Sequence, residues 1–269
     1  MSILGFLLSL TAIAVLVIPF DSYRLWNDPD YWINNPKTAA PFWTSYFGSK
    51  DFEHVSLDKT NAKTTSEVSE GIRVDNFGFE INIQADDFPD DFMFLHSVNY
   101  GEIPPVLQID ITRPDNNTFT VYYSSLPTTS SVNNTFTDRI FSTNNNIKES
   151  LSPYQSLFNF PISGIEPQVL LFSDTNNLQV LHGTYHISQK FFLFDNSSSI
   201  ENVGVILGGK VFGIMGTDDL RRDLFVGIIW GIPIALFIGL TVSIFSISIG
   251  LIYGVVSGYK GKKIDEGMM

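Results

Sequence analysis

Apolar residues gather at the two ends of the chain, and the long middle part is polar. The runs Ile3–Phe20 and Leu224–Tyr259 contain no charged side chain. A helix that crosses the hydrocarbon core of a bilayer needs about 20 apolar residues. The first run is just long enough for one span, whereas the second would extend over roughly 54 Å as a helix and exceeds one straight span.

The second run divides at Gly231–Pro233, because a proline inside a helix removes a backbone hydrogen bond and clashes with the preceding turn. The pattern therefore predicts a separate interfacial helix over Asp218–Trp230. The predicted order is transmembrane helix 1 over 1–21, an extracytoplasmic domain over 22–212, a charged motif and interfacial helix over 213–232, transmembrane helix 2 over 233–259 and a tail over 260–269. A cleaved signal peptide is the alternative for the first run, but no basic stretch precedes it.

The middle part carries the signals of short strands. Gly78–Gln84 alternates apolar and polar residues, and Pro105–Leu126 reads as two strands joined by a Pro-Asp-Asn-Asn turn. Further strands are expected within Pro167–Asp195 and Asn202–Gly213. Turns about every ten residues predict an antiparallel, sandwich-like β domain. Two segments, 49–71 and 130–150, read as poorly structured or mobile surface regions.

The distribution of charge along the chain predicts how the chain is oriented across the membrane. Residues 21–213 contain 23 acidic and 11 basic side chains, which accounts for all of the net charge of −12. Lys260, Lys262 and Lys263 follow the second apolar run, so the positive-inside rule places both termini in the cytoplasm and residues 22–212 outside a cell membrane that the chain crosses twice. An acidic middle part argues against nucleic acid as a partner. The chain contains no cysteine.

Three N-x-S/T sequons lie in the predicted outward part, at Asn116, Asn133 and Asn196. Their position agrees with this topology, because glycans are added to outward-facing loops. An Asn- and Ser-rich segment also produces sequons by chance, so the two interpretations stay open.

Little in the sequence indicates catalysis, a metal or a cofactor. His182 and His186 are four residues apart, but in a strand that spacing separates them by about 13 Å. The acidic cluster Asp86, Asp87, Asp90 and Asp91 lacks the ligand spacing of a known calcium loop and is expected to be a solvated loop. No nucleophile elbow or phosphate-binding glycine loop is found. We therefore expect no enzyme.

The second apolar run is rich in small residues. Two consecutive G-x-x-x-G patterns run from Gly250 to Gly258, and Gly239 lies further back along the same run. Small residues let helices approach closely in lipid, where no hydrophobic effect drives association. The alternative is a span that merely tolerates glycine. We predict helix packing by Gly239, Gly250, Gly254 and Gly258.

The motif GTDDLRRDLF, Gly216–Phe225, places five charges directly before the second apolar run. Asp218 and Asp219 suit the positive end of a helix, and Thr217 or Asp218 is a candidate N-cap. Asp218 and Arg222 have the i, i+4 spacing of a helical ion pair. Without reference to any family, this motif therefore predicts the charged N-terminus of a helix, located in the headgroup region of the membrane.

The region from Gly216 to Met269 also resembles dipeptide/oligopeptide/nickel-type ABC-transporter permeases, in particular their C-type subunit. The family pattern runs G-T-D-x-x-G-R-D, then spaced glycines in a span, then A-G-Y-x-G-G-x-x-D. The first block is matched by Gly216, Thr217, Asp218, Arg222 and Asp223. The later blocks are matched by Gly231, Gly239, Gly250, Gly254, Gly258, Tyr259, Gly261 and Asp265.

The resemblance implies a permease subunit that imports peptides or similar solutes, or the N-terminal part of one; a split or degraded subunit is the alternative. Its implied partners are a second permease subunit, two ABC ATPase subunits that hydrolyse ATP, an extracytoplasmic solute-binding protein and the lipid bilayer. Arg221 departs from the pattern, which has glycine there, and the predicted outward domain is far larger than the family's short loop. Alternative interpretations are a two-span surface protein with an adhesive or structural β domain and a membrane-anchored sensor.

Overall fold

The computed structural model describes residues 2–48, 50–69, 71–128, 134–195 and 197–260. The chain divides into two compact units. The helical unit consists of residues up to 31 together with those from 224 onward, and the sandwich domain is Trp32–Asp223. The two units are described separately below.

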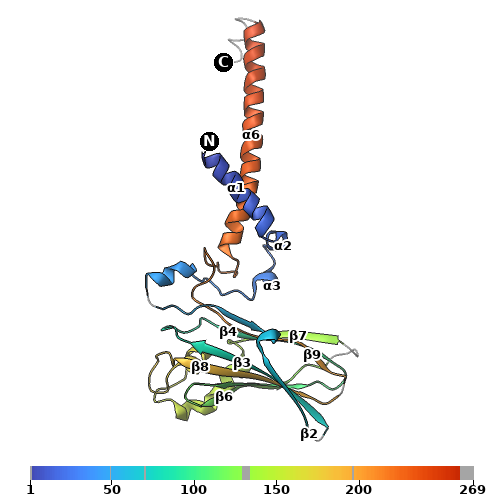
Figure 1. The fold of residues 1–269 in the computed structure, drawn as a ribbon, viewed down its shortest axis with the longest axis vertical. Helices are drawn as coiled ribbons and strands as arrows, with labels where there is room; N and C mark the ends of the chain where they lie inside the picture. The colour runs from blue at the N-terminus through green and yellow to red at the C-terminus, as the bar shows by residue number, and fades with distance from the viewer. Residues whose placement is uncertain (1, 49, 70, 129–133, 196, 261–269) are drawn as a thin grey trace. The chain divides into compact units, whose positions relative to one another are not determined.

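The sandwich domain consists of two antiparallel sheets (Figure 1). The four-stranded sheet has the order β1 (Val55–Asp58), β9 (Ser199–Leu207), β4 (Phe92–Tyr100) and β7 (Asn134–Phe141). The five-stranded sheet has the order β2 (Lys63–Ser69), β3 (Ile72–Ile83), β8 (Gly183–Leu193), β5 (Val106–Thr112) and β6 (Thr118–Ser125). Neighbouring strands are antiparallel throughout, so the predicted antiparallel sandwich is confirmed.

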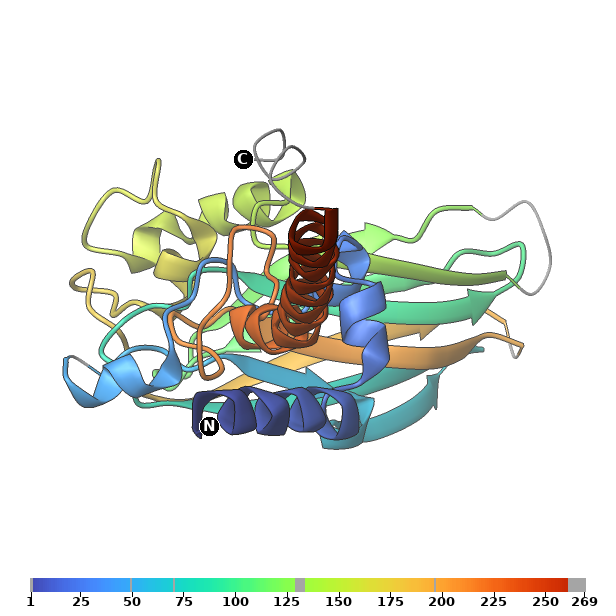
Figure 2. The ribbon, with the colours of Figure 1, turned by 90° about the horizontal axis from the view of Figure 1, so that it is seen from above.

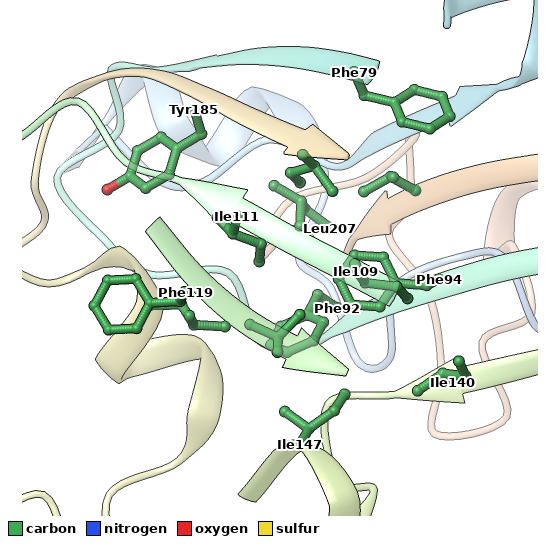
Figure 3. Close-up of a cluster of buried hydrophobic side chains, with 14 of the residues drawn as sticks. Phe79, Phe92, Phe94, Ile109, Ile111, Phe119, Ile140, Ile147, Tyr185 and Leu207 are labelled. Atoms are coloured by element: carbon green, nitrogen blue, oxygen red, sulfur yellow. The ribbon is translucent and has the colours of Figure 1, made fainter. Parts of the chain in front are cut away.

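The core lies between the two sheets. In β3 the alternate residues Phe77, Phe79, Ile81 and Ile83 are buried, as the period of a strand with one inner face requires. In Figure 3, Ile109 of the five-stranded sheet lies beside Phe94 of the four-stranded sheet, and Phe79, Phe92 and Leu207 belong to the same buried cluster. Burial of these large apolar side chains is the main favourable term in the stability of the domain.

Short helices lie at one end of the sandwich (Figure 2). They are α4 (Asn145–Leu151), the 3-10 helix η3 (Ser152–Leu157) and α5 (Pro167–Phe172). Their buried residues, among them Ile147 and Leu171, extend the core. The prediction of strands across the whole of Pro167–Asp195 is therefore wrong in its first part. Pro167 cannot donate to a sheet, whereas its fixed φ suits the first turn of a helix.

Two segments expected to be irregular contain strands. Segment 49–71 contains β1 and β2, and segment 130–150 contains β7 and α4, although its first residues lie outside the described part. Strand β2 is exposed along its whole length, so it has no alternation for a sequence reading to detect. It forms because β3 pairs with every one of its residues from Lys63 to Ser69.

The helical unit contains α1 (Ser2–Val17), α2 (Phe20–Arg24) and α6 (Leu224–Lys260), and α3 (Pro29–Trp32) lies at its boundary. Trp26 packs against the backbone of α6, where a Cβ at Gly227 would be 2.5 Å from its ring. The ring of Trp230 stacks on Tyr23, with centroids 5.5 Å apart, and meets Phe20 edge-on. An aromatic cluster thus joins α2 to the first turns of α6.

Helix α6 corrects the prediction of a separate interfacial helix over 218–230. It begins at Leu224 and continues through Pro233 without a break. Proline removes one backbone hydrogen bond, but in an apolar setting the remaining backbone groups have no better partner than the helix itself.

One helix within the described residues is long and apolar enough to cross a membrane, namely Leu224–Tyr259 with a mean hydropathy of 2.3. Its apolar side chains are exposed around the helix, unlike those of a core helix in a soluble protein. The 16 residues of α1 cover only about 24 Å, so the first span stays a prediction.

The core also contains a histidine whose charge state governs stability. His96 in β4 is buried, and neither ring nitrogen has a hydrogen-bond partner within the described residues. Burial lowers its pKa to about 4, against a smaller opposing effect of Asp138. The folded protein therefore binds fewer protons than the unfolded chain, in which histidine titrates near pH 6.5.

We predict that His96→Phe reduces the acid sensitivity of the fold. In the wild-type protein, His96 should lower the free energy of unfolding by about 2 kcal/mol as the pH falls from 7 to 5. In the variant, the decrease in the free energy of unfolding over this pH range should be smaller by that amount. Chemical denaturation of the full chain in detergent at both pH values measures it. The exposed His186→Phe is the matched control, and an unchanged pH dependence in His96→Phe would contradict the prediction.

Candidate functional site

The charged motif Gly216–Asp223 forms a closed loop rather than the first turn of a helix. The carboxylate of Asp218 accepts hydrogen bonds from the backbone N–H groups of Leu220 (3.0 Å) and Arg222 (2.9 Å). The guanidinium Nε of Arg222 donates to the same carboxylate at 2.7 Å. Thr217 and Asp223 pair as an antiparallel bridge, so the two ends of the loop meet immediately before α6 begins.

These contacts set the charge of Asp218. Partial burial alone would raise its pKa, but the hydrogen bonds and the positive charge of Arg222 outweigh burial and lower the pKa below its usual value. The carboxylate is therefore ionised at neutral pH. The predicted i, i+4 pair of Asp218 and Arg222 exists, but it closes a loop instead of stabilising a helix.

Thr217 fixes this loop to the segment that enters the domain. Its side chain is 5% exposed. The hydroxyl donates to the carbonyl of Pro36 (2.8 Å) and accepts from the N–H of Ala39 (2.9 Å), while the backbone N–H of Thr217 donates to the carbonyl of Ala39 (3.0 Å). The N–H of Thr38 donates to the carbonyl of Asp218 at 3.0 Å. We call this junction of residues 35–40 with residues 216–223 the clamp.

Gly216 makes the clamp sterically possible. Its φ of 75° lies in the left-handed region, and a Cβ there would collide with the carbonyl oxygen of Ala39 and lie 3.1 Å from the carbonyl carbon of Ala40. Only glycine combines this φ with so close an approach of two backbones. The role of the first residue of the motif is therefore local and steric.

The backbone conformation of residue 221 explains why the family pattern has glycine at this position. Its φ is 65°, a conformation that glycine adopts freely and arginine rarely does. The guanidinium donates to the carbonyl of Asn35 (2.6 Å) and to the carboxylate of Asp91 (2.5 Å). The amide of Asn35 donates back to the carbonyl of Arg221 at 3.1 Å. Three polar contacts thus hold an arginine where the backbone prefers glycine.

The acidic cluster 86–91 is not simply a solvated loop, which corrects that expectation. Asp91 pairs with Arg221, and Asp87 pairs with Lys210 at 2.6 Å. Beside them His54 is kept neutral, because burial lowers its pKa to about 4 and the charge of Arg221 adds to that effect while Asp91 opposes it. Part of the acidic cluster therefore serves to hold the clamp.

No group of three or more potential metal ligands occurs among the described residues. His182 contacts the carbonyl of Ala85 at 2.9 Å, and His186 lies 3.6 Å from Glu80. Asn116 lies in the exposed turn between β5 and β6, whereas Asn133 and Asn196 fall outside the described residues. Attachment of glycans stays a prediction.

The small residues of α6 remain available for packing. A Cβ built on Gly239, Gly250, Gly254 or Gly258 would meet no other atom within 4 Å. The structure thus leaves this face of the helix open, and its contact with another helix stays a prediction.

No protein-family profile matches the chain. A stretch of 54 residues is 48% identical to the "Dipeptide transport system permease protein DppC" of Bacillus subtilis and 46% identical to "Oligopeptide transport system permease protein OppC" of the same organism. It covers 20% of this chain and 17% and 18% of those proteins. DppC of Haemophilus influenzae is 38% identical over 58 residues, or 20% of its length. The matches thus span about a fifth of the length of these relatives.

Two solved structures have a remote similarity to part of this chain. One is the C-terminal CBM6 of LamC from Zobellia galactanivorans, with a TM-score of 0.28 and 8% identity over 57% of this chain and 98% of that one. The other is infectious bursal disease virus strain Gx, with a TM-score of 0.29 and 12% identity over 60% of this chain and 33% of that one. At these TM-scores neither likeness supports a conclusion about fold or function.

We predict different costs for two replacements of Arg221. Arg221→Ala keeps an unfavourable φ and leaves Asp91 without this cation, so it should lower the free energy of unfolding by roughly 2 kcal/mol. Arg221→Gly loses the same contacts but regains about 1 kcal/mol by relieving the backbone. Chemical denaturation of the full chain in detergent compares them, with the exposed Asp219→Ala as control. Equal losses in both variants would show that the backbone is not strained.

The steric role of Gly216 has a matched control. Gly164 also has a positive φ, 83°, but a Cβ there would meet no atom within 4 Å. Gly164→Ala should cost about 1 kcal/mol, whereas Gly216→Ala should cost roughly 3 kcal/mol because it also forces the clamp apart. Thermal unfolding of both variants measures the difference, and similar melting temperatures would contradict the steric argument.

Proposed function

We propose that the chain is a membrane-spanning permease subunit of an ABC importer for peptides or similar solutes, or the N-terminal part of such a subunit. The observation that carries this proposal is the stretch 48% identical to a dipeptide-transport permease protein. The long apolar helix α6 supports it, because a permease must cross the bilayer. The comparison covers only part of each protein, so the solute and the complex belong to the proposal.

In this proposal the clamp is the joint between the two parts of the subunit. Chain leaving the clamp at Asp223 enters α6 at the next residue. The clamp and α6 are therefore joined by a single peptide bond, between Asp223 and Leu224. The family motif would then act by attaching the span to whatever precedes it, which requires no catalytic side chain.

The proposed topology has two spans, near 1–21 and 233–259, with residues 22–212 outside the cell and both termini in the cytoplasm. The lysines at 260, 262 and 263 support the cytoplasmic position of the C-terminal tail. The exposure of apolar side chains on α6 supports its contact with lipid or with other membrane helices.

The proposed partners are a second permease subunit, two ABC ATPase subunits and an extracytoplasmic solute-binding protein. ATP hydrolysis would take place on the ATPase subunits. The excess of acidic residues between 21 and 213 favours a basic surface on any protein that docks to the outward domain.

Peptide uptake by living cells tests the proposal. Deletion of the gene should reduce ATP-dependent uptake of labelled di- to pentapeptides to background, and the wild-type gene should restore it. Uptake of a free amino acid serves as the control and should not change. Unchanged peptide uptake in the deletion strain, together with failure of any ABC ATPase to purify with the tagged chain, would contradict the proposal.

A further inference from the structure

The sandwich domain exposes a compact set of large apolar side chains. They belong to the 3-10 helix η1 (Phe42–Tyr46), to the residue after it and to the loop that precedes the charged motif. We call them the aromatic surface: Phe42, Trp43, Tyr46, Phe47, Ile214 and Met215. Tyr46 is 75% exposed and Phe47 is 85% exposed. Such clusters on a soluble domain mark interaction sites.

Hydrogen bonds hold the two segments of the aromatic surface together. The backbone N–H of Phe42 donates to the carbonyl of Gly213 at 2.9 Å, and the indole N–H of Trp43 donates to the carbonyl of Ile214 at 3.0 Å. The rings of Phe42 and Tyr46 meet edge-on at 6.2 Å. The aromatic surface is therefore preorganised by contacts within the domain, and no partner is needed to order it.

The polar groups between these rings are satisfied within the helix. The hydroxyl of Thr44 donates to the carbonyl of Pro41 at 2.7 Å, and that of Ser45 donates to the carbonyl of Phe42 at 2.7 Å. Their hydrogen-bonding demand is met without water. The outer side of η1 can therefore enter an apolar environment at little cost.

Covalent connection keeps the aromatic surface close to the start of α6. Met215 is two residues before Thr217, which pairs with Asp223, the neighbour of Leu224. Whatever the orientation of α6, these links limit Met215 to about 17 Å from its first residue. Helix α6 is roughly 54 Å long and a bilayer with its headgroups is about 40–45 Å thick, so a spanning α6 begins within roughly 14 Å of the outer headgroup zone, a distance that the links to Met215 can bridge.

Local charge favours lipid over a basic protein as the occupant. The domain is strongly acidic, yet residues 31–50, which include four residues of the aromatic surface, contain no acidic side chain and two exposed lysines, Lys37 and Lys50. Asp51 and Asp218 lie just beyond the surface in sequence. Exposed lysines on the same segment as the aromatic residues suit anionic headgroups above an apolar layer. Tryptophan and tyrosine are enriched at that depth because they have an apolar body and a polar atom.

We propose that the aromatic surface inserts into the headgroup region of the outer leaflet and holds the sandwich domain against the bilayer. This inference rests on the proposed function, because it requires α6 to span the membrane. It assigns the lipid surface as a second attachment of the domain, in addition to the covalent connections.

The chain has no cysteine, so single-cysteine variants allow a direct test. The full chain is reconstituted in vesicles of phosphatidylcholine and phosphatidylglycerol, and a spin label is placed at Phe47→Cys. Two matched positions are labelled separately: Val68→Cys on β2, 73% exposed, and Ile247→Cys on α6, 71% exposed. Relaxation by oxygen, which partitions into lipid, is compared with relaxation by a water-soluble nickel complex.

We expect the label at 47 to favour oxygen, as the label at 247 does, while the label at 68 favours nickel. Equal nickel accessibility at 47 and 68, with 247 in lipid, would overturn the inference and leave the proposed span intact. Shielding of 47 from both reagents would indicate a protein occupant and would also overturn it. Nickel accessibility at 247 would show that the span itself has failed. Tyr46→Cys provides a second reporter, since truncating either exposed ring removes no core contact.

Discussion

The clamp between residues 35–40 and residues 216–223 is the constraint on which the architecture depends. It pairs the segment that enters the sandwich domain with the segment that leaves it, so a domain of nearly 200 residues begins and ends at one place. Its contacts are short hydrogen bonds between groups that are largely shielded from water, centred on Thr217 and Asp218. A buried group of this kind is costly to leave unpaired, which makes the junction specific.

Arg221 shows how a departure from a family pattern becomes interpretable once its surroundings are known. The backbone at this position requires a positive φ, which glycine supplies without strain. Arginine is strained in this conformation, but its side chain adds hydrogen bonds to Asn35 and to Asp91. Asp91 belongs to a different part of the chain. The junction is thereby fastened to the acidic loop before β4, which a glycine could not do.

Much of the β architecture is predictable, but the clamp is not. The hairpin of β5 and β6 has a clear period-2 pattern and a Pro-Asp-Asn-Asn turn, so its prediction is confirmed. Strand β4 escapes prediction because the polar His96 lies on its buried face and the apolar Met93 and Leu95 lie on the other, so apolar and polar residue types do not alternate although burial does from Phe94 onward. The clamp joins residues more than 170 positions apart, and no local pattern encodes such a contact. The one signal available was Arg221 itself, because an arginine in place of glycine requires partners.

The meeting of the domain's two ends has a consequence for how such a chain arises. A gene segment that encodes a body with adjoining ends can be gained, lost or exchanged in one event without changing the separation of the helices on either side. The sandwich domain would then be an exchangeable module between the helical segments that flank it in the sequence. The helical segments and the sandwich domain would then have separate evolutionary origins. Sequence similarity to other proteins would be confined to one stretch of the chain.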